Sequence, residues 1–112
     1  MRLLIVLLLL LALSACSSES TAVTPGQYSV LLTWQASVEM ENPIVGYNVY
    51  RSTLSGGPYS KLTSNTVNAL EFSDTAVSDG TTYYYVVTAV DSQGVESGFS
   101  NQISAITPEG QN

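Results

Sequence analysis

Histidine is absent from this 112-residue chain, and cysteine, lysine and arginine are scarce. A catalytic nucleophile would therefore need a lysine or a carboxylate as its partner, and Lys61 is the only lysine. A carboxylate pair acting on a glycosidic bond is the remaining catalytic option. Most of the acidic residues, however, fall in expected loops without an obvious cleft. We predict that the chain is not an enzyme and uses no cofactor or metal.

A single long hydrophobic run, residues 3–13, stands near the amino terminus, directly before Ser14, Ala15 and Cys16. As a helix it would cross only about half of a roughly 30 Å hydrocarbon core, so it is too short for a stable membrane anchor. It also has no polar face, which argues against a core helix. Arg2 before it and small residues after it are typical of a secretory signal. An ordinary cleaved signal peptide, with an incidental cysteine, is one interpretation.

The second interpretation follows from the tetrapeptide Leu13-Ser14-Ala15-Cys16, which resembles the lipobox of bacterial lipoproteins. The resemblance implies that residues 1–15 are a signal peptide and that the Cys16 thiol receives a diacylglycerol. Two or more acyl chains, palmitate among them, would hold the chain stably to a lipid bilayer. Ser17 after the cysteine favours the outer membrane in a Gram-negative cell. In a Gram-positive cell, the same anchor would lie in the cytoplasmic membrane and face outward.

Removal of this leader would leave two cationic residues against nine acidic ones, a net charge of −7. A chain this acidic gains nothing from a phosphate backbone, so nucleic acid is not expected as a partner. With Cys16 acylated, no thiol would remain for a disulfide or a redox centre. The mature length of about 97 residues is sufficient for one domain with a modest core.

Residues 16–27 are rich in serine and threonine and are expected to form a flexible tether. From Tyr28 onward the pattern changes to short runs of alternating polarity separated by turn residues, which predicts strands. The expected strands are 30–34, 44–51, 59–63, 70–73, 81–90 and 99–106. This spacing indicates an all-β fold, a two-sheet antiparallel β-sandwich over residues 28–108, followed by a tail at 109–112.

Three of these segments resemble strands B, C and F of the fibronectin type III family. They are Val30-x-Leu32-x-Trp34, Ile44–Arg51 with its Gly-Tyr-x-Val, and the segment beginning Gly80-Thr81-Thr82-Tyr83. The resemblance covers about residues 28–107 and implies an immunoglobulin-like sandwich with Trp34 in the core and Tyr83 as the tyrosine-corner residue. Only residues 21–24 are available for the first strand, A, so we expect that strand to be short or absent. The expected structural core consists of Leu32, Trp34, Tyr47, Val49, Tyr83, Tyr85 and Val87.

Two surfaces are candidates for binding. In the family, strands C and F are neighbours, so Tyr50 and Tyr84 are expected to face outward together, with Val86 extending this face and Tyr59 at its border. Tyrosine-rich faces bind proteins and glycans. The alternative is that these tyrosines form cross-strand pairs that stabilise the sheet.

The second surface is acidic. Glu39, Glu41, Asp91 and Glu96 fall in loops at one end of the expected sandwich, where carboxylates could hold Ca²⁺. Their spacing matches no dedicated calcium loop, and the favoured interpretation is solvated charge.

The sequence therefore predicts a membrane-anchored envelope lipoprotein that displays a non-catalytic fibronectin type III module for a protein or a polysaccharide. The competing prediction is an inert structural spacer with no dedicated ligand. The aromatic face discriminates between them: an exposed, contiguous patch favours binding, and a covered one favours the spacer.

Overall fold

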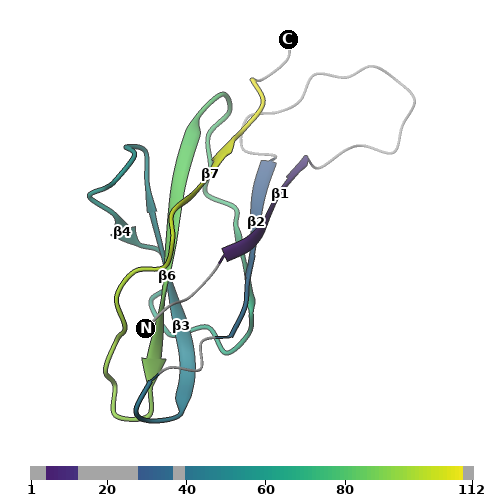
Figure 1. The fold of residues 1–112 in the computed structure, drawn as a ribbon. Coiled ribbons are helices and arrows are strands. Elements are labelled where there is room, and N and C mark those ends of the chain that lie inside the picture. Colours follow the sequence, from purple (N-terminus) through teal and green to yellow (C-terminus); the bar gives the residue numbers. More distant parts are fainter. Residues whose placement is uncertain (1–4, 13–27, 37–39, 110–112) are drawn as a thin grey trace.

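The computed structural model describes residues 5–12, 28–36 and 40–109, and the strands in these ranges form two antiparallel sheets (Figure 1). The first sheet has the order β1-β2-β5, from Ile5–Ala12, Tyr28–Trp34 and Glu71–Asp74. The described residues contain no helix with the length and hydropathy needed to span a membrane. The predicted all-β, two-sheet class is confirmed.

The second sheet has the order β4-β3-β6-β7 and carries most of the candidate surface residues. Its strands are β4 (Ser60–Lys61), β3 (Ile44–Ser52), β6 (Thr82–Asp91) and β7 (Ile103–Ile106). The long strands β3 and β6 pair over most of their length, with Val49 opposite Val87 and Tyr50 opposite Val86. Because successive side chains alternate in direction, Val49 and Val87 face the other sheet while Tyr50 and Val86 lie on the outer face.

The core lies between the sheets and follows the period of two in the sequence. In β2 the residues Tyr28, Val30, Leu32 and Trp34 are buried and the residues between them are half-buried. The structure buries all seven residues named for the core, Leu32, Trp34, Tyr47, Val49, Tyr83, Tyr85 and Val87. Trp34 packs edge-on against Tyr47, with their ring centroids 5.6 Å apart. This pair lies across the two sheets, so it joins β2 to β3.

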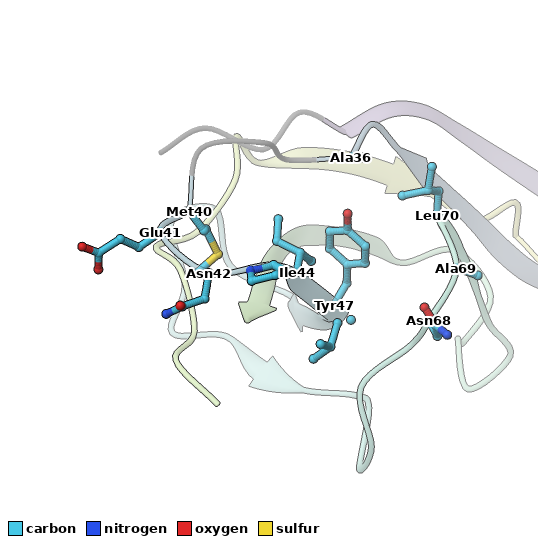
Figure 2. Close-up of a pocket in the computed structure, with 12 residues that line it drawn as sticks. Ala36, Met40, Glu41, Asn42, Ile44, Tyr47, Asn68, Ala69 and Leu70 are labelled. Carbon is cyan, nitrogen blue, oxygen red and sulfur yellow. The ribbon is translucent and has the colours of Figure 1, made fainter. Parts of the chain in front are cut away.

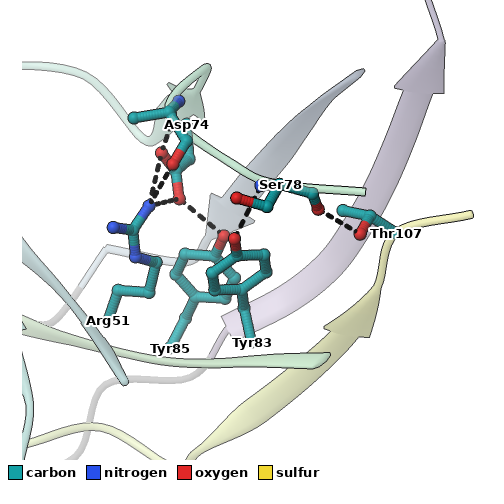
Figure 3. A network of polar contacts seen from close by, with 7 residues as sticks. Arg51, Asp74, Ser78, Tyr83, Tyr85 and Thr107 are labelled. Atoms are coloured by element: carbon teal, nitrogen blue, oxygen red, sulfur yellow. Dashed lines mark hydrogen bonds and ion pairs between the residues drawn. The ribbon is translucent and has the colours of Figure 1, made fainter. Parts of the chain in front are cut away.

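A buried polar network also joins the two sheets (Figure 3). The Arg51 Nη1 atom donates to both carboxylate oxygens of Asp74, at 3.1 and 2.8 Å, and the Tyr85 hydroxyl donates to Asp74 Oδ2 at 2.7 Å. Burial and the neighbouring carboxylate raise the pKa of Tyr85 above its ordinary value. The backbone N–H of Ser78 donates to the Tyr83 hydroxyl at 2.7 Å, which is the contact of a tyrosine corner.

The position beside β2 differs from the expectation for strand A. It is taken by Ile5–Ala12, which pairs antiparallel with Tyr28–Trp34, although the sequence predicts a short strand at 21–24 or none. Residues 21–24 lie outside the described residues. The expectation took the apolar segment only as a leader, whereas an edge strand with unpaired backbone groups can accept any extended segment.

The last strand is shorter than predicted, because β7 begins at Ile103 rather than near residue 99. Two serines explain the difference. The hydroxyl oxygens of Ser97 and Ser100 accept hydrogen bonds from the backbone N–H groups of Ala89 and Val87, both at 2.9 Å. Side-chain acceptors thus replace backbone carbonyls along this part of β6, and the regular ladder starts only after them. β4 is likewise limited to Ser60–Lys61 within the predicted 59–63.

Candidate functional site

Three aromatic rings meet on the outer face of the second sheet, and we call Tyr50, Tyr59 and Phe99 the aromatic cluster. Phe99 lies between the tyrosines: its ring centroid is 5.1 Å from that of Tyr50 and 5.2 Å from that of Tyr59. Both contacts are edge-to-face, with interplanar angles of 69°. Phe99 is 55% exposed, whereas both tyrosines are half-buried. The cluster therefore presents one exposed ring framed by two supported ones.

Hydrogen bonds fix the two tyrosines at the edges of the cluster. The Tyr50 hydroxyl donates to the Glu96 carboxylate, and the Tyr59 hydroxyl donates to Gln102 Oε1. The same Gln102 oxygen accepts the backbone N–H of Gly56 at 2.7 Å, which ties the turn after β3 to the segment before β7. The rings therefore lie in a preformed arrangement, because their polar tips already have partners within the chain.

Glu96 reaches across the outer face of the second sheet. Besides the Tyr50 hydroxyl, its Oε2 atom accepts the Thr88 hydroxyl at 2.6 Å and the Asn48 amide at 3.3 Å. Burial alone would raise the pKa of Glu96, but the bonds from Thr88, Tyr50 and Asn48 outweigh it and lower this pKa below its ordinary value. In turn, burial and then the Glu96 carboxylate raise the pKa of Tyr50 to about 12. Both effects favour a neutral tyrosine bonded to an ionised glutamate.

The predicted binding face is only partly as expected. Tyr50, Tyr59 and Tyr84 are half-buried, but Val86 is only 2% exposed, so the expectation that it extends an exposed surface is wrong. Tyr84 lies opposite Ser52 on β3 and Ser104 on β7, one pleat along from the Tyr50–Val86 pair. The aromatic ring that completes the surface is instead Phe99.

Phe99 was expected to begin the strand 99–106 and was not included in the predicted binding face. The segment Ser97-Gly98-Phe99-Ser100-Asn101 has one large aromatic residue among small and polar ones, and this isolation was the available signal. Pairing cannot be read from it, since the serine hydroxyls replace the backbone acceptors there. Only the tertiary structure brings Phe99 over Tyr50 and Tyr59.

The acidic residues considered for Ca²⁺ have separate roles in the structure. The Asp91 carboxylate accepts the backbone N–H groups of Val95 at 2.8 Å and Gln93 at 2.9 Å, which lowers the pKa of Asp91 and closes the turn after β6. The Glu96 carboxylate accepts a hydrogen bond from Thr88 on the outer face of the second sheet, and Glu41 is exposed. Glu39 lies outside the described residues, among which no group of three or more potential metal ligands gathers.

A pocket of about 680 Å³ opens at the end of the sandwich that holds the loop between β2 and β3 (Figure 2). Its walls include Met40, Ile44 and Leu70, and Tyr47 forms part of its inner surface. Figure 2 shows the Tyr47 hydroxyl directed into this space and the Glu41 carboxylate directed away from it. No sequence pattern predicts this pocket, because its walls come from segments distant along the chain.

Two facing antiparallel sheets, a buried tryptophan and a tyrosine corner define an immunoglobulin-like β-sandwich. The model of the fibronectin type III domain matches residues 18–106, and the chain belongs to this family. A solved structure described as a Fn3-like protein from Clostridium thermocellum is 38% identical, with a TM-score of 0.62. The match covers 75% of this chain and 81% of that one.

The curated relatives are far longer proteins. An amylopullulanase from Thermoanaerobacter thermohydrosulfuricus is 44% identical over 80 residues, which make up 71% of this chain and 5% of that protein. An α-amylase from Niallia circulans is 34% identical over 82 residues, or 73% of this chain and 6% of that protein. The chain thus spans about one twentieth of the length of these relatives, which are carbohydrate-active enzymes.

Proposed function

We propose that this protein is a non-catalytic, lipid-anchored module of the bacterial cell envelope that binds a polysaccharide through the aromatic cluster. The observation that carries the proposal is Phe99, an aromatic ring 55% exposed between two tyrosines whose hydroxyls are held in place. Sugar rings pack their apolar faces on such aromatic surfaces, and rings fixed in advance lose little entropy on binding.

The relatives favour a polysaccharide over a protein as the partner. Their matching regions are small parts of an amylopullulanase and an α-amylase, so modules of this kind accompany carbohydrate chemistry. A non-catalytic role agrees with the lack of histidine and with the engagement of the Glu96 and Asp91 carboxylates in hydrogen bonds.

The anchor in this proposal is Cys16, which lies outside the described residues. Cleavage before it would remove β1 and leave β2 paired only with β5. The chain would then be exported and held to the bilayer by its acyl chains, in the outer membrane if the cell is Gram-negative. A Cys16→Ser variant should lose labelled palmitate and leave the membrane fraction, and continued labelling would refute the anchor.

The binding test is affinity electrophoresis through gels containing soluble starch, pullulan or a β-1,2-glucan. We expect at least one glucan to retard the protein, and Phe99→Ala to abolish the retardation. Val95→Ala is a matched control, because Val95 lies in the same segment and is also 55% exposed. Thermal melting of each variant shows whether the sandwich remains folded.

The second candidate, an inert envelope spacer, is favoured by the burial of Val86 and by the internal bonds of the tyrosine hydroxyls. Those features also describe an outer face that stabilises itself through cross-strand contacts. Mobility unaffected by every glucan, in wild type and Phe99→Ala alike, would replace the binding proposal with this one.

A further inference from the structure

The pocket at the end of the sandwich is built by segments that are hydrogen-bonded to both sheets. One wall is residues 68–70, and the preceding residue, Val67, exchanges two backbone hydrogen bonds with Tyr47 of β3, at 2.9 and 2.8 Å. At its other end, the Leu70 carbonyl accepts the backbone N–H of Trp34 of β2 at 3.1 Å. Backbone hydrogen bonds therefore hold this wall to both sheets.

A tyrosine hydroxyl points into this pocket. Tyr47 is only 6% exposed, so its ring is held in the core while the residue also lines the pocket. Figure 2 shows that hydroxyl facing the space between Ile44 and Leu70. A ligand with a polar group at this point could exchange a hydrogen bond with the hydroxyl, which can both donate and accept.

The remaining lining defines the chemistry of such a ligand. The lining has no lysine or arginine to pair with an anionic group. Its one carboxylate, Glu41, points away from the pocket and so is not placed to pair with a cationic group. Met40, Ile44 and Leu70 offer an apolar wall, while the exposed Asn68 offers an amide donor and acceptor. An apolar face together with several hydroxyl groups describes a neutral sugar. A purely apolar group would displace water from the Tyr47 hydroxyl without replacing its hydrogen bond.

We propose that this pocket binds one neutral sugar unit, at the end of a glucan or in a free oligosaccharide. The volume of about 680 Å³ lies within the range of small-molecule sites. The inference rests on the proposed function only in sharing its ligand class, since the pocket and the aromatic cluster have no residue in common. The pocket would hold a chain end, whereas the exposed cluster would hold the side of a polymer.

The sequence provides a local reporter for the test. Trp34 is the only tryptophan, and its ring packs edge-on against Tyr47. A sugar bound at the Tyr47 hydroxyl should therefore change the tryptophan fluorescence, while binding at the aromatic cluster should not. We would titrate the full chain in detergent with maltotriose and with cellotriose.

Tyr47→Phe removes only the hydroxyl and preserves the buried ring. We expect wild type to give a saturable fluorescence change, and Tyr47→Phe to weaken the apparent affinity by about three- to tenfold, the effect of one neutral hydrogen bond. Tyr59→Phe, the same substitution on the aromatic cluster, should leave the titration unchanged. Asn68→Ala is a second pocket variant that places no demand on folding, since Asn68 is exposed, and it should also weaken binding.

The absence of a saturable change in wild type, or equal affinities in wild type, Tyr47→Phe and Asn68→Ala, overturns the pocket proposal. Glucan retardation that is lost in Phe99→Ala, with no fluorescence response to either trisaccharide, refutes the pocket alone. A fluorescence response that Tyr47→Phe weakens supports the pocket proposal. If such a response is found while no glucan retards the protein, the pocket proposal is supported and binding at the aromatic cluster is refuted.

Discussion

Asp74→Ala removes the buried carboxylate that joins the two sheets. Asp74 is 3% exposed and accepts hydrogen bonds from Arg51, from the Tyr85 hydroxyl and from the backbone N–H of Ala76. The substitution leaves the fully buried Tyr85 hydroxyl without a partner, which costs about 1–3 kcal/mol. It also leaves the Arg51 guanidinium without its counter-charge.

The total cost is set by how far Arg51 can be compensated. The Arg51 side chain is 24% exposed, its Nη1 atom also donates to the Ala76 carbonyl at 3.0 Å, and its guanidinium lies 5.0 Å from the centre of the Tyr83 ring. These contacts reduce the penalty but do not replace the ion pair. We therefore expect the free energy of unfolding to fall by about 3 kcal/mol, at the lower end of the range for a broken buried pair. A small domain has only about 5–15 kcal/mol in total.

Urea denaturation followed by Trp34 fluorescence measures this loss. Glu71→Ala is the matched control, because Glu71 lies on the same strand, β5, but is exposed. Asp74→Asn keeps an acceptor for Tyr85 and should cost less than alanine. Arg51→Met combined with Asp74→Leu should cost less than the sum of the single changes, because no uncompensated charge remains. A loss below about 1 kcal/mol for Asp74→Ala, equal to that of Glu71→Ala, would refute the reasoning.

Two further predictions concern the site regions. Gly46→Ala would place a Cβ 2.7 Å from Thr66 Cβ and should lower the free energy of unfolding by about 1–3 kcal/mol, whereas Gly98→Ala meets nothing within 4 Å and should be neutral in the same urea assay. Glu96 has a lowered pKa when folded, so its contribution is present above about pH 4.5 and lost as the pH falls through that pKa. Between about pH 7 and pH 3, the free energy of unfolding should therefore fall slightly more in wild type than in Glu96→Gln. The difference between the two should be under about 1 kcal/mol, because Glu96 is exposed. Equal pH profiles would show that the Glu96 bonds do not favour its ionised form.

The alternation of polarity was sufficient to place the core. In β2 and β6, a period of two decides which side chains face the other sheet, so Leu32, Trp34, Tyr85 and Val87 could be assigned to the interior in advance. The same rule was not sufficient to predict the exposure of Val86. It correctly places Val86 on the outer face, but it cannot tell whether that face is open to solvent or covered by another segment.

Strand ends were less predictable than strand interiors. The last strand was expected to begin at residue 99, yet before Ile103 the hydroxyls of Ser97 and Ser100 accept hydrogen bonds from backbone N–H groups of β6. A sequence pattern records which residues are apolar, and it does not record whether a backbone N–H is bonded to a carbonyl or to a side chain.

The amino-acid pattern was enough to predict the class of the fold, the buried face of each main strand and the turn positions, because these depend on periodicity and on local backbone preference. The binding surfaces, in contrast, become visible only in the folded chain. The ring of Phe99 meets Tyr50 and Tyr59 from a distant segment, and residues 68–70 form a wall of the pocket beside Tyr47. Both sites arise from contacts between segments far apart in the chain, and such contacts depend on how the two sheets pack and how the loops cross them.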